Sequence, residues 1–213
     1  MNTNDLISML ATETPAVDHG ARRRKIAILL LAGALISFVA MVASMGLNPA
    51  LRDAILNPWF WVRFAFIVSS SALAWRFFFR LGKPGMAANT RWLWVLLPIA
   101  VLAVIGGVML LQAPEDKRLD MVFGATWTVC SRNIALLSAP IFFVLVLIAR
   151  GFAPTRLRLT GAILGFFSGA VAALVYSMHC PAVAPSFLMI WYSLGMAIPA
   201  MVGMLLGKEL LAW

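Results

Sequence analysis

The chain has 213 residues, of which 62% are hydrophobic and only 12% charged, and its formal net charge at pH 7 is +9. This fraction of polar residues is too small to cover the surface of a water-soluble globule of this size. The composition therefore excludes an ordinary soluble domain and indicates a membrane protein. The positive charges are dispersed among short loops rather than gathered on one face, which argues against a nucleic-acid-binding protein.

The chain begins with a polar tail, residues 1–25, which precedes the first hydrophobic run. Apolar residues recur in it at helical spacing, namely Leu6, Met9 and Leu10, with Ile7 beside them. Asp5 lies near the start, where a helix dipole favours negative charge. The sequence therefore predicts a short amphipathic helix. Such a helix can lie on a membrane or fill a groove on another protein. The acids Asp5 and Glu13 favour the protein partner.

Six hydrophobic stretches follow, each long enough, at about 20 residues, to cross the hydrocarbon core as a helix. They are residues 26–45, 59–79, 92–111, 127–148, 159–178 and 187–206. Lipid-exposed backbone must satisfy its own hydrogen bonds, and these runs are too long for barrel strands. The sequence therefore predicts an all-α polytopic membrane protein, with residues 26–213 forming one domain of six transmembrane helices.

Lys and Arg are distributed unequally between the two sets of loops, which predicts the orientation of the chain. Only three cations, Arg52, Lys117 and Arg118, fall in the loops of one side. Twelve flank the other ends of the spans: Arg22, Arg23, Arg24, Lys25, Arg76, Arg80, Lys83, Arg91, Arg150, Arg156, Arg158 and Lys208. The positive-inside bias then predicts that both termini are cytoplasmic, and it accounts for most of the net charge.

Within the spans, three features indicate how the helices pack. Arg63 interrupts the second span and is expected to act as an interfacial anchor or as a charge between packed helices. No Asp or Glu lies inside any of the six stretches, which argues against a proton- or cation-coupled transporter. Small residues that allow helices to approach closely recur in the third, fifth and sixth spans: Gly106, Gly107, Gly161, Gly165, Gly169, Gly203 and Gly207.

Cys130 and Cys180 are the only two cysteines, and the predicted orientation places both near the outer ends of the fourth and fifth spans. The short inner loop between these spans favours antiparallel neighbours, and a disulfide then needs Cα atoms within about 7 Å. In an oxidising compartment the pair is a candidate sensor, as a disulfide, as a dithiol awaiting oxidation, or as a soft-metal ligand pair with His179. A permanent structural disulfide or two inert thiols remain alternatives.

Two further residues extend this candidate sensor. Arg132 follows Cys130 by two positions, and a nearby cation would lower the pKa of the thiol, although residues two apart on a helix do not share a face. His179, next to Cys180, can serve as a base, a metal ligand or an interfacial polar group. No resident cofactor is expected. A transient heavy-metal ion on Cys130, Cys180 and His179 is the one metal site the sequence suggests.

Several short motifs make the chain resemble the NrsF (DUF1109) family of six-span bacterial membrane proteins. The specific ones are Trp-x-x-Cys at Trp127 and Cys130, and His179-Cys180 followed by Trp191-Tyr192. Others carry the resemblance over nearly the whole chain: Asp5-Leu6-Ile7, Leu10-Ala11, Asn57-Pro58, Phe60-Trp61, Pro84-Gly85, Pro140, Ala153-Pro154, Gly161-Ala162, Tyr176, Gly203, Leu210-Leu211 and Trp213. The chain departs from the family pattern at Ala182, where many relatives have an acid, and at Ala212, where an arginine is common.

The resemblance implies a membrane-bound anti-sigma factor of the bacterial inner membrane, which is not an enzyme. Its cytoplasmic N-terminal segment, with Asp5, Leu6, Ile7 and Leu10, would hold an extracytoplasmic-function sigma factor. Its two cysteines would respond to heavy-metal or oxidative stress. A small multispan transporter and an envelope thiol oxidoreductase are the alternatives, but oxidoreductases of that kind generally need a vicinal Cys-x-x-Cys pair, which this sequence lacks. A haem carrier is a third alternative, for which the sequence offers only His19 and His179, on opposite sides.

Overall fold

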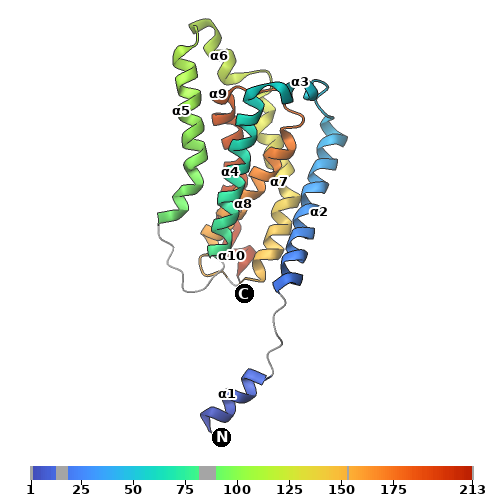
Figure 1. Ribbon diagram of the computed structural model, residues 1–213, viewed down its shortest axis with the longest axis vertical. Helices are drawn as coiled ribbons and strands as arrows, with labels where there is room; N and C mark the ends of the chain where they lie inside the picture. Colours follow the sequence, from blue (N-terminus) through green and yellow to red (C-terminus); the bar gives the residue numbers. More distant parts are fainter. Residues whose placement is uncertain (1, 13–18, 82–89, 153, 213) are drawn as a thin grey trace.

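A computed structural model describes residues 2–12, 19–81, 90–152 and 154–212, and the regular structure in these ranges is helical. The long helices form an elongated bundle, and the short first helix lies beyond one end of it (Figure 1). In chain order the elements are α1 (Thr3–Thr12), α2 (His19–Met45), α3 (Leu51–Leu56), α4 (Pro58–Leu81), the 3-10 helix η1 (Thr90–Leu96), α5 (Leu97–Gln112), α6 (Glu115–Phe123), α7 (Trp127–Arg150), α8 (Leu157–Tyr176), α9 (Pro185–Phe187), the π-helix η2 (Leu188–Tyr192) and α10 (Ser193–Leu211).

Six stretches of the described chain are helical, apolar and long enough to cross a membrane, which confirms the predicted number of spans. They are Gly20–Met45, Pro58–Leu81, Leu93–Gln112, Glu115–Arg150, Leu157–Tyr176 and Pro185–Leu211. The helix that carries the first span begins before residue 26, the predicted start of the hydrophobic run. The helix already includes the four cations before that position, because Arg and Lys are good helix formers.

Two short helices occupy segments that the sequence analysis assigned to breaks between spans. Helix α6 begins after Pro114, which fixes an extended residue before the helix, and it carries Glu115 and Asp116 in its first turn, where the helix dipole favours acids. It ends at Gly124, whose φ of +56° suits glycine. Helix α3 similarly fills part of the connection between the first two spans. Both helices are too short to cross a membrane by themselves, and α6 forms the polar start of the fourth candidate stretch, Glu115–Arg150.

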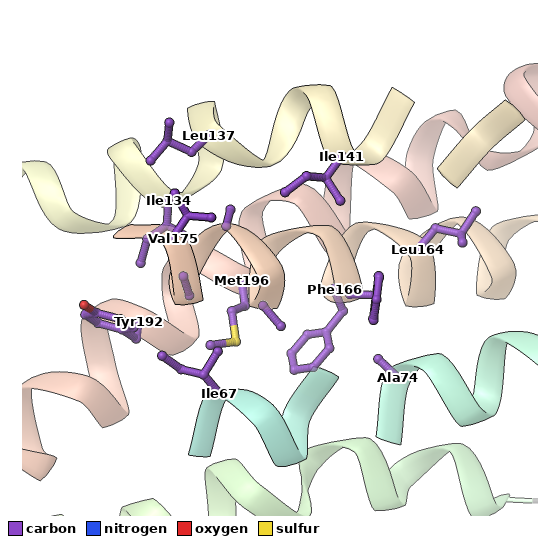
Figure 2. Packing of buried hydrophobic residues seen from close by; sticks show 14 of the residues in the cluster. Ile67, Ala74, Ile134, Leu137, Ile141, Leu164, Phe166, Val175, Tyr192 and Met196 are labelled. Carbon is purple, nitrogen blue, oxygen red and sulfur yellow. The ribbon is translucent and has the colours of Figure 1, made fainter. Parts of the chain in front are cut away.

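Helix α8 is the centre of the bundle. Of its membrane-spanning stretch 78% is buried, against 17% for α2 and 22% for the third span, so α2 and α5 are peripheral. Figure 2 shows side chains from four elements meeting around it: Ile67 of α4, Ile134 and Ile141 of α7, Phe166 of α8 and Met196 of α10. Helices α7 and α8 pack against each other, as the short loop between them predicted.

Helices α8 and α10 approach so closely that glycine is required on both sides of their contact. A Cβ atom on Gly161 would overlap the carbonyl oxygen of Gly203, and one on Gly207 would overlap the carbonyl oxygen of Leu157. This confirms the packing role predicted from the glycine spacing in the fifth and sixth spans. Gly107 differs, because a Cβ there meets nothing within 4 Å.

Replacing Gly165 by Leu is expected to destabilise the bundle by about 1–3 kcal/mol or more. A Cβ at this position would overlap the carbonyl oxygen of Pro199 and crowd the Cα of Ala200, so backbone rather than a flexible side chain would have to move. Thermal unfolding of the purified protein in detergent measures the loss. Gly107→Leu is the matched control, and equal destabilisation by both changes would contradict the role of the α8–α10 contact.

One face of α2 contacts α7 along most of its length. The Ser37 hydroxyl donates a hydrogen bond to the Leu137 carbonyl at 2.8 Å, and Met41 is fully buried. Near the end of the helix, the Asn133 amide nitrogen lies 3.6 Å from the sulfur of Met45. Helix α2 therefore packs mainly on α7, with a smaller contact with α8.

The bundle has two different ends (Figure 1). The cysteine end comprises α3, α6 and the loop 177–184 between α8 and α9. The tail end comprises the start of α2, the ends of α4 and α7, and the C-terminus.

Candidate functional site at the cysteine end

The two cysteines are brought together at the cysteine end. Cys130 lies in the first turn of α7 and Cys180 in the loop 177–184, and both are buried free thiols, 0% and 1% exposed. Thr126 connects them, because its carbonyl accepts the Cys130 amide at 3.0 Å and its hydroxyl lies 3.7 Å from the Cys180 sulfur. The Cys130 thiol is also a hydrogen-bond partner of Cys180.

These partners favour the charged form of one thiol. Cys180 lies between two membrane spans, and the hydrogen bond from Cys130 lowers the pKa of its thiol to about 6, in spite of burial, which raises it. The Thr126 hydroxyl and the Ala182 amide also lower this pKa. A lowered pKa favours the thiolate form of Cys180. The thiolate is the form that attacks oxidants.

Arg63 of α4 holds the loop that carries Cys180. It is 1% exposed, and its guanidinium donates hydrogen bonds to the carbonyls of Ser177 at 2.9 Å, Cys180 at 2.9 Å and Ala182 at 3.0 Å. A charge this deeply buried requires such partners. Arg63 is therefore a charge between packed elements, and the alternative that it is an interfacial anchor is wrong.

The predicted partner Arg132 takes a different position. Its side chain is exposed on α7, where it lines a surface groove of about 400 Å³ together with Trp127 and Trp191. The cation whose guanidinium contacts the cysteine loop is Arg63. Two residues of separation turn a helical side chain through about 200°, which explains why Arg132 and Cys130 face different surroundings.

His179 connects the cysteine loop to α2. Its Nδ1 lies 3.0 Å from the carbonyl oxygen of Gly46, and the Asn48 amide donates a hydrogen bond to the Met178 carbonyl at 3.1 Å. Gly46 ends α2 with a φ of +77°. The cysteine loop is therefore held by α2 as well as by α4 and α7.

The suggested metal site is not assembled. Among the residues that the structure describes, no group of three His, Cys, Asp or Glu side chains lies close enough to hold a metal ion. The predicted set of Cys130, Cys180 and His179 fails because the imidazole of His179 lies at Gly46.

The aromatic residues of the sequence motifs form two pairs at the cysteine end. The rings of Trp127 and Trp191 are 5.2 Å apart, and those of Tyr176 and Tyr192 are 6.2 Å apart. The hydroxyls of both tyrosines are buried, and both lie close to the thiol of Cys180. Ser131 donates to the carbonyl of Trp191 at 2.7 Å, which ties α7 to the π-helical turn η2.

Sequence reasoning missed the contributions of Thr126 and Gly46, and for Arg63 it left two alternatives, of which the charge between packed helices is the one observed. One signal for Arg63 was available, because a cation inside a span, with no acid inside any span, must be satisfied by carbonyl groups or by water. No local signal marks Thr126 or Gly46, because their roles depend on residues far away in the chain.

A short helix, α1, occupies the part of the tail in which the sequence predicts one. Asp5 and Ile7 are exposed on it, Ile7 with 59% of its surface, while the side chains of Leu6 and Leu10 lie outside those that the structure describes. Met9 is also exposed, at 58%.

Comparison with known proteins finds relatives that match the chain over its full length. The model of the NrsF family, described as "Negative regulator of sigma F", matches residues 10–213. A "Probable anti-sigma-F factor NrsF" of Azospira oryzae is 39% identical over 215 residues, and the "Anti-sigma-F factor NrsF" of Caulobacter vibrioides is 31% identical over 214 residues. Both alignments cover 100% of this chain and of the relative. No solved structure matches the chain significantly.

Proposed function

The chain belongs to the NrsF family of negative regulators of sigma F, and on this premise we propose that it is an anti-sigma-F factor. As a regulatory membrane protein, it would sequester its sigma factor on the cytoplasmic face of the bacterial inner membrane. Residues 1–25 form the cytoplasmic tail and residues 26–213 the transmembrane domain. The charge asymmetry supports this orientation, since the cations concentrate at the tail end.

The observation that carries the proposal is the exposed apolar surface of α1. Ile7 and Met9 each expose more than half of their surface on a short helix outside the bundle. An amphipathic helix of this kind gains stability when its apolar face enters a groove on another protein. Helix α1 is therefore the segment of this chain best suited to bind a soluble sigma factor.

We propose that oxidation of the cysteine pair releases the sigma factor. The Cys180 thiolate attacks a hydroperoxide, takes one oxygen to become a sulfenic acid, and releases the alcohol or water as leaving group. The Cys130 thiol then attacks the sulfenic sulfur, a disulfide forms, and a second water leaves. The two sulfur atoms lose two electrons to the hydroperoxide, and the two protons that the leaving groups take up come from the Cys130 thiol and from solvent.

Helix α2 connects this chemistry with the tail. At the cysteine end it contacts the loop 177–184 through Gly46 and Asn48, and at the tail end it leads directly into the residues after α1. A disulfide requires the loop to move toward α7, which strains the hydrogen bond between His179 and Gly46. Because α2 is the least buried of the six spans, it is the helix that can shift as a rigid body.

Ile7→Glu is expected to weaken sigma binding at least about thirtyfold, because a charge replaces an apolar side chain at a partner groove, where such a residue contributes about 2 kcal/mol or more. Co-purification of the full-length protein with its co-expressed sigma factor, followed by titration in detergent, measures the change.

Ser8→Glu is the matched control. Ser8 is also exposed on α1 but lies opposite the predicted apolar stripe, because it is two residues, or about 200°, from both Leu6 and Leu10. The same charge is added to the same helix, so Ser8→Glu should retain the sigma factor. If both variants lose it equally, or if neither does, α1 is not the binding helix.

A further inference from the structure

The tail end carries a groove that the sigma-binding role does not use. It has a volume of about 660 Å³ and lies between the first turns of α2 and the end of α4. Arg22 and Arg23 line its mouth, while Ile26 and Leu30 of α2 and Trp75 and Phe79 of α4 form its apolar walls. A second groove of about 560 Å³ flanks the opposite side of Arg22.

The guanidinium of Arg22 is fixed in place between these grooves. It donates a hydrogen bond to the Gly151 carbonyl at 2.9 Å and lies over the Phe152 ring, 4.0 Å from its centre. Phe152 is in turn held edge-on by Phe78 and Phe79, each at 5.6 Å. One hydrogen bond uses one of five N–H donors, so the remaining donors are pre-oriented for an acceptor.

We propose that this groove binds one anionic phospholipid, with its phosphate at Arg22 and Arg23 and its acyl chains against the apolar walls. The position of the groove selects this occupant, because its walls belong to two membrane spans while its mouth lies at the cationic turn where α2 enters the membrane. A soluble anion would gain nothing from contact with the apolar walls. A soluble protein cannot reach walls that belong to membrane-spanning helices. Basic pockets between helices at this depth suit anionic headgroups.

Charge complementarity supports an anionic rather than a zwitterionic lipid. Ten of the described Lys and Arg residues lie at the tail end, and within the described part of the bundle Glu209 is the acid placed there. A planar guanidinium binds phosphate through two parallel hydrogen bonds, which a fixed Arg22 can offer without further ordering. Bound lipid would hold the start of α2 against Phe152.

The full-length protein in phosphatidylcholine nanodiscs, titrated with phosphatidylglycerol and measured by native mass spectrometry, tests the site. Wild type should bind one phosphatidylglycerol in preference to added phosphatidylcholine. Arg22→Gln with Arg23→Gln should weaken the binding of phosphatidylglycerol at least about tenfold, because both cations that attract the phosphate are removed. Arg156→Gln with Arg158→Gln removes the same charge from exposed residues at the same end and should leave binding unchanged.

Ala27→Trp keeps every cation but fills the groove, because Ala27 lines it and is exposed. It should also weaken binding at least about tenfold, and it tests the site even if the double arginine variant fails to fold. Equal weakening by both arginine pairs would show a diffuse charge effect and overturn the proposal. Unchanged binding in Ala27→Trp, or equal affinity for phosphatidylcholine, would overturn it as well.

Discussion

Replacing Arg63 by Ala is expected to destabilise the protein by several kcal/mol and to slow disulfide formation between Cys130 and Cys180 at least about tenfold. The guanidinium satisfies three carbonyls around the cysteine loop, and each buried polar group left unpaired costs about 1–3 kcal/mol. Without these bonds Cys180 is no longer held beside Cys130. Thermal unfolding in detergent measures the first effect, and mass spectrometry of alkylated thiols after timed exposure to hydrogen peroxide measures the second.

Two further variants separate a local role from a general one. Arg63→Lys keeps the charge but not the fork of donors, and should restore only part of the stability and rate. Arg132→Ala removes an exposed cation close to Cys130 in sequence and should change the rate by less than about twofold. If Arg132→Ala slows the reaction as much as Arg63→Ala, the positioning role of Arg63 is wrong.

Replacing Cys130, Cys180 or both by Ser is expected to abolish release of the sigma factor under oxidative stress while leaving sequestration in resting cells unchanged. Serine is close in size to cysteine, so the packing around Thr126 should survive, but no disulfide can form. Moving a two-state equilibrium from 1:99 to 99:1 takes about 5.5 kcal/mol of differential stabilisation, which a covalent bond can supply and a hydroxyl cannot. A transcriptional reporter driven by the sigma factor measures the response.

Ser138→Ala is the control for this series. Ser138 is a buried hydroxyl on the same helix as Cys130, two turns away, and it bonds only to the Ala135 carbonyl, at 2.6 Å. Its loss should leave the stress response intact. Constitutive release in the serine variants would show that the cysteines are needed for the fold, and a normal response in them would show that the sensor lies elsewhere.

The sequence predicts the spans of this protein better than it predicts the surroundings of the cysteines. Span number follows from local hydropathy, because each helix must satisfy its own backbone within lipid, so the six helices appear close to the residues expected. This argument does not reveal helices α3 and α6, because neither is long enough to cross a membrane by itself. They form contacts at the cysteine end, such as the hydrogen bond from the Ser186 hydroxyl to the Met121 carbonyl of α6.

The neighbours of Cys180 depend on contacts over long sequence separations. Arg63 lies 117 residues before Cys180, and Gly46 lies 133 residues before His179. Hydropathy and spacing cannot reveal such pairs, so proximity in sequence favoured Arg132, whose side chain lies elsewhere on α7. The proximity of the two thiols was accessible, because it needs only the antiparallel packing of consecutive spans joined by a short loop.

The central claim is that the thiols at one end of the bundle control binding by the tail at the other. The direct measurement is the dissociation constant of the sigma factor for the wild-type protein in nanodiscs, determined once with both thiols reduced and once after peroxide has joined them in a disulfide. The proposal predicts at least about a hundredfold weaker binding in the oxidised protein and full recovery on reduction. Equal affinity in the two states, with the disulfide verified by mass spectrometry, would contradict it.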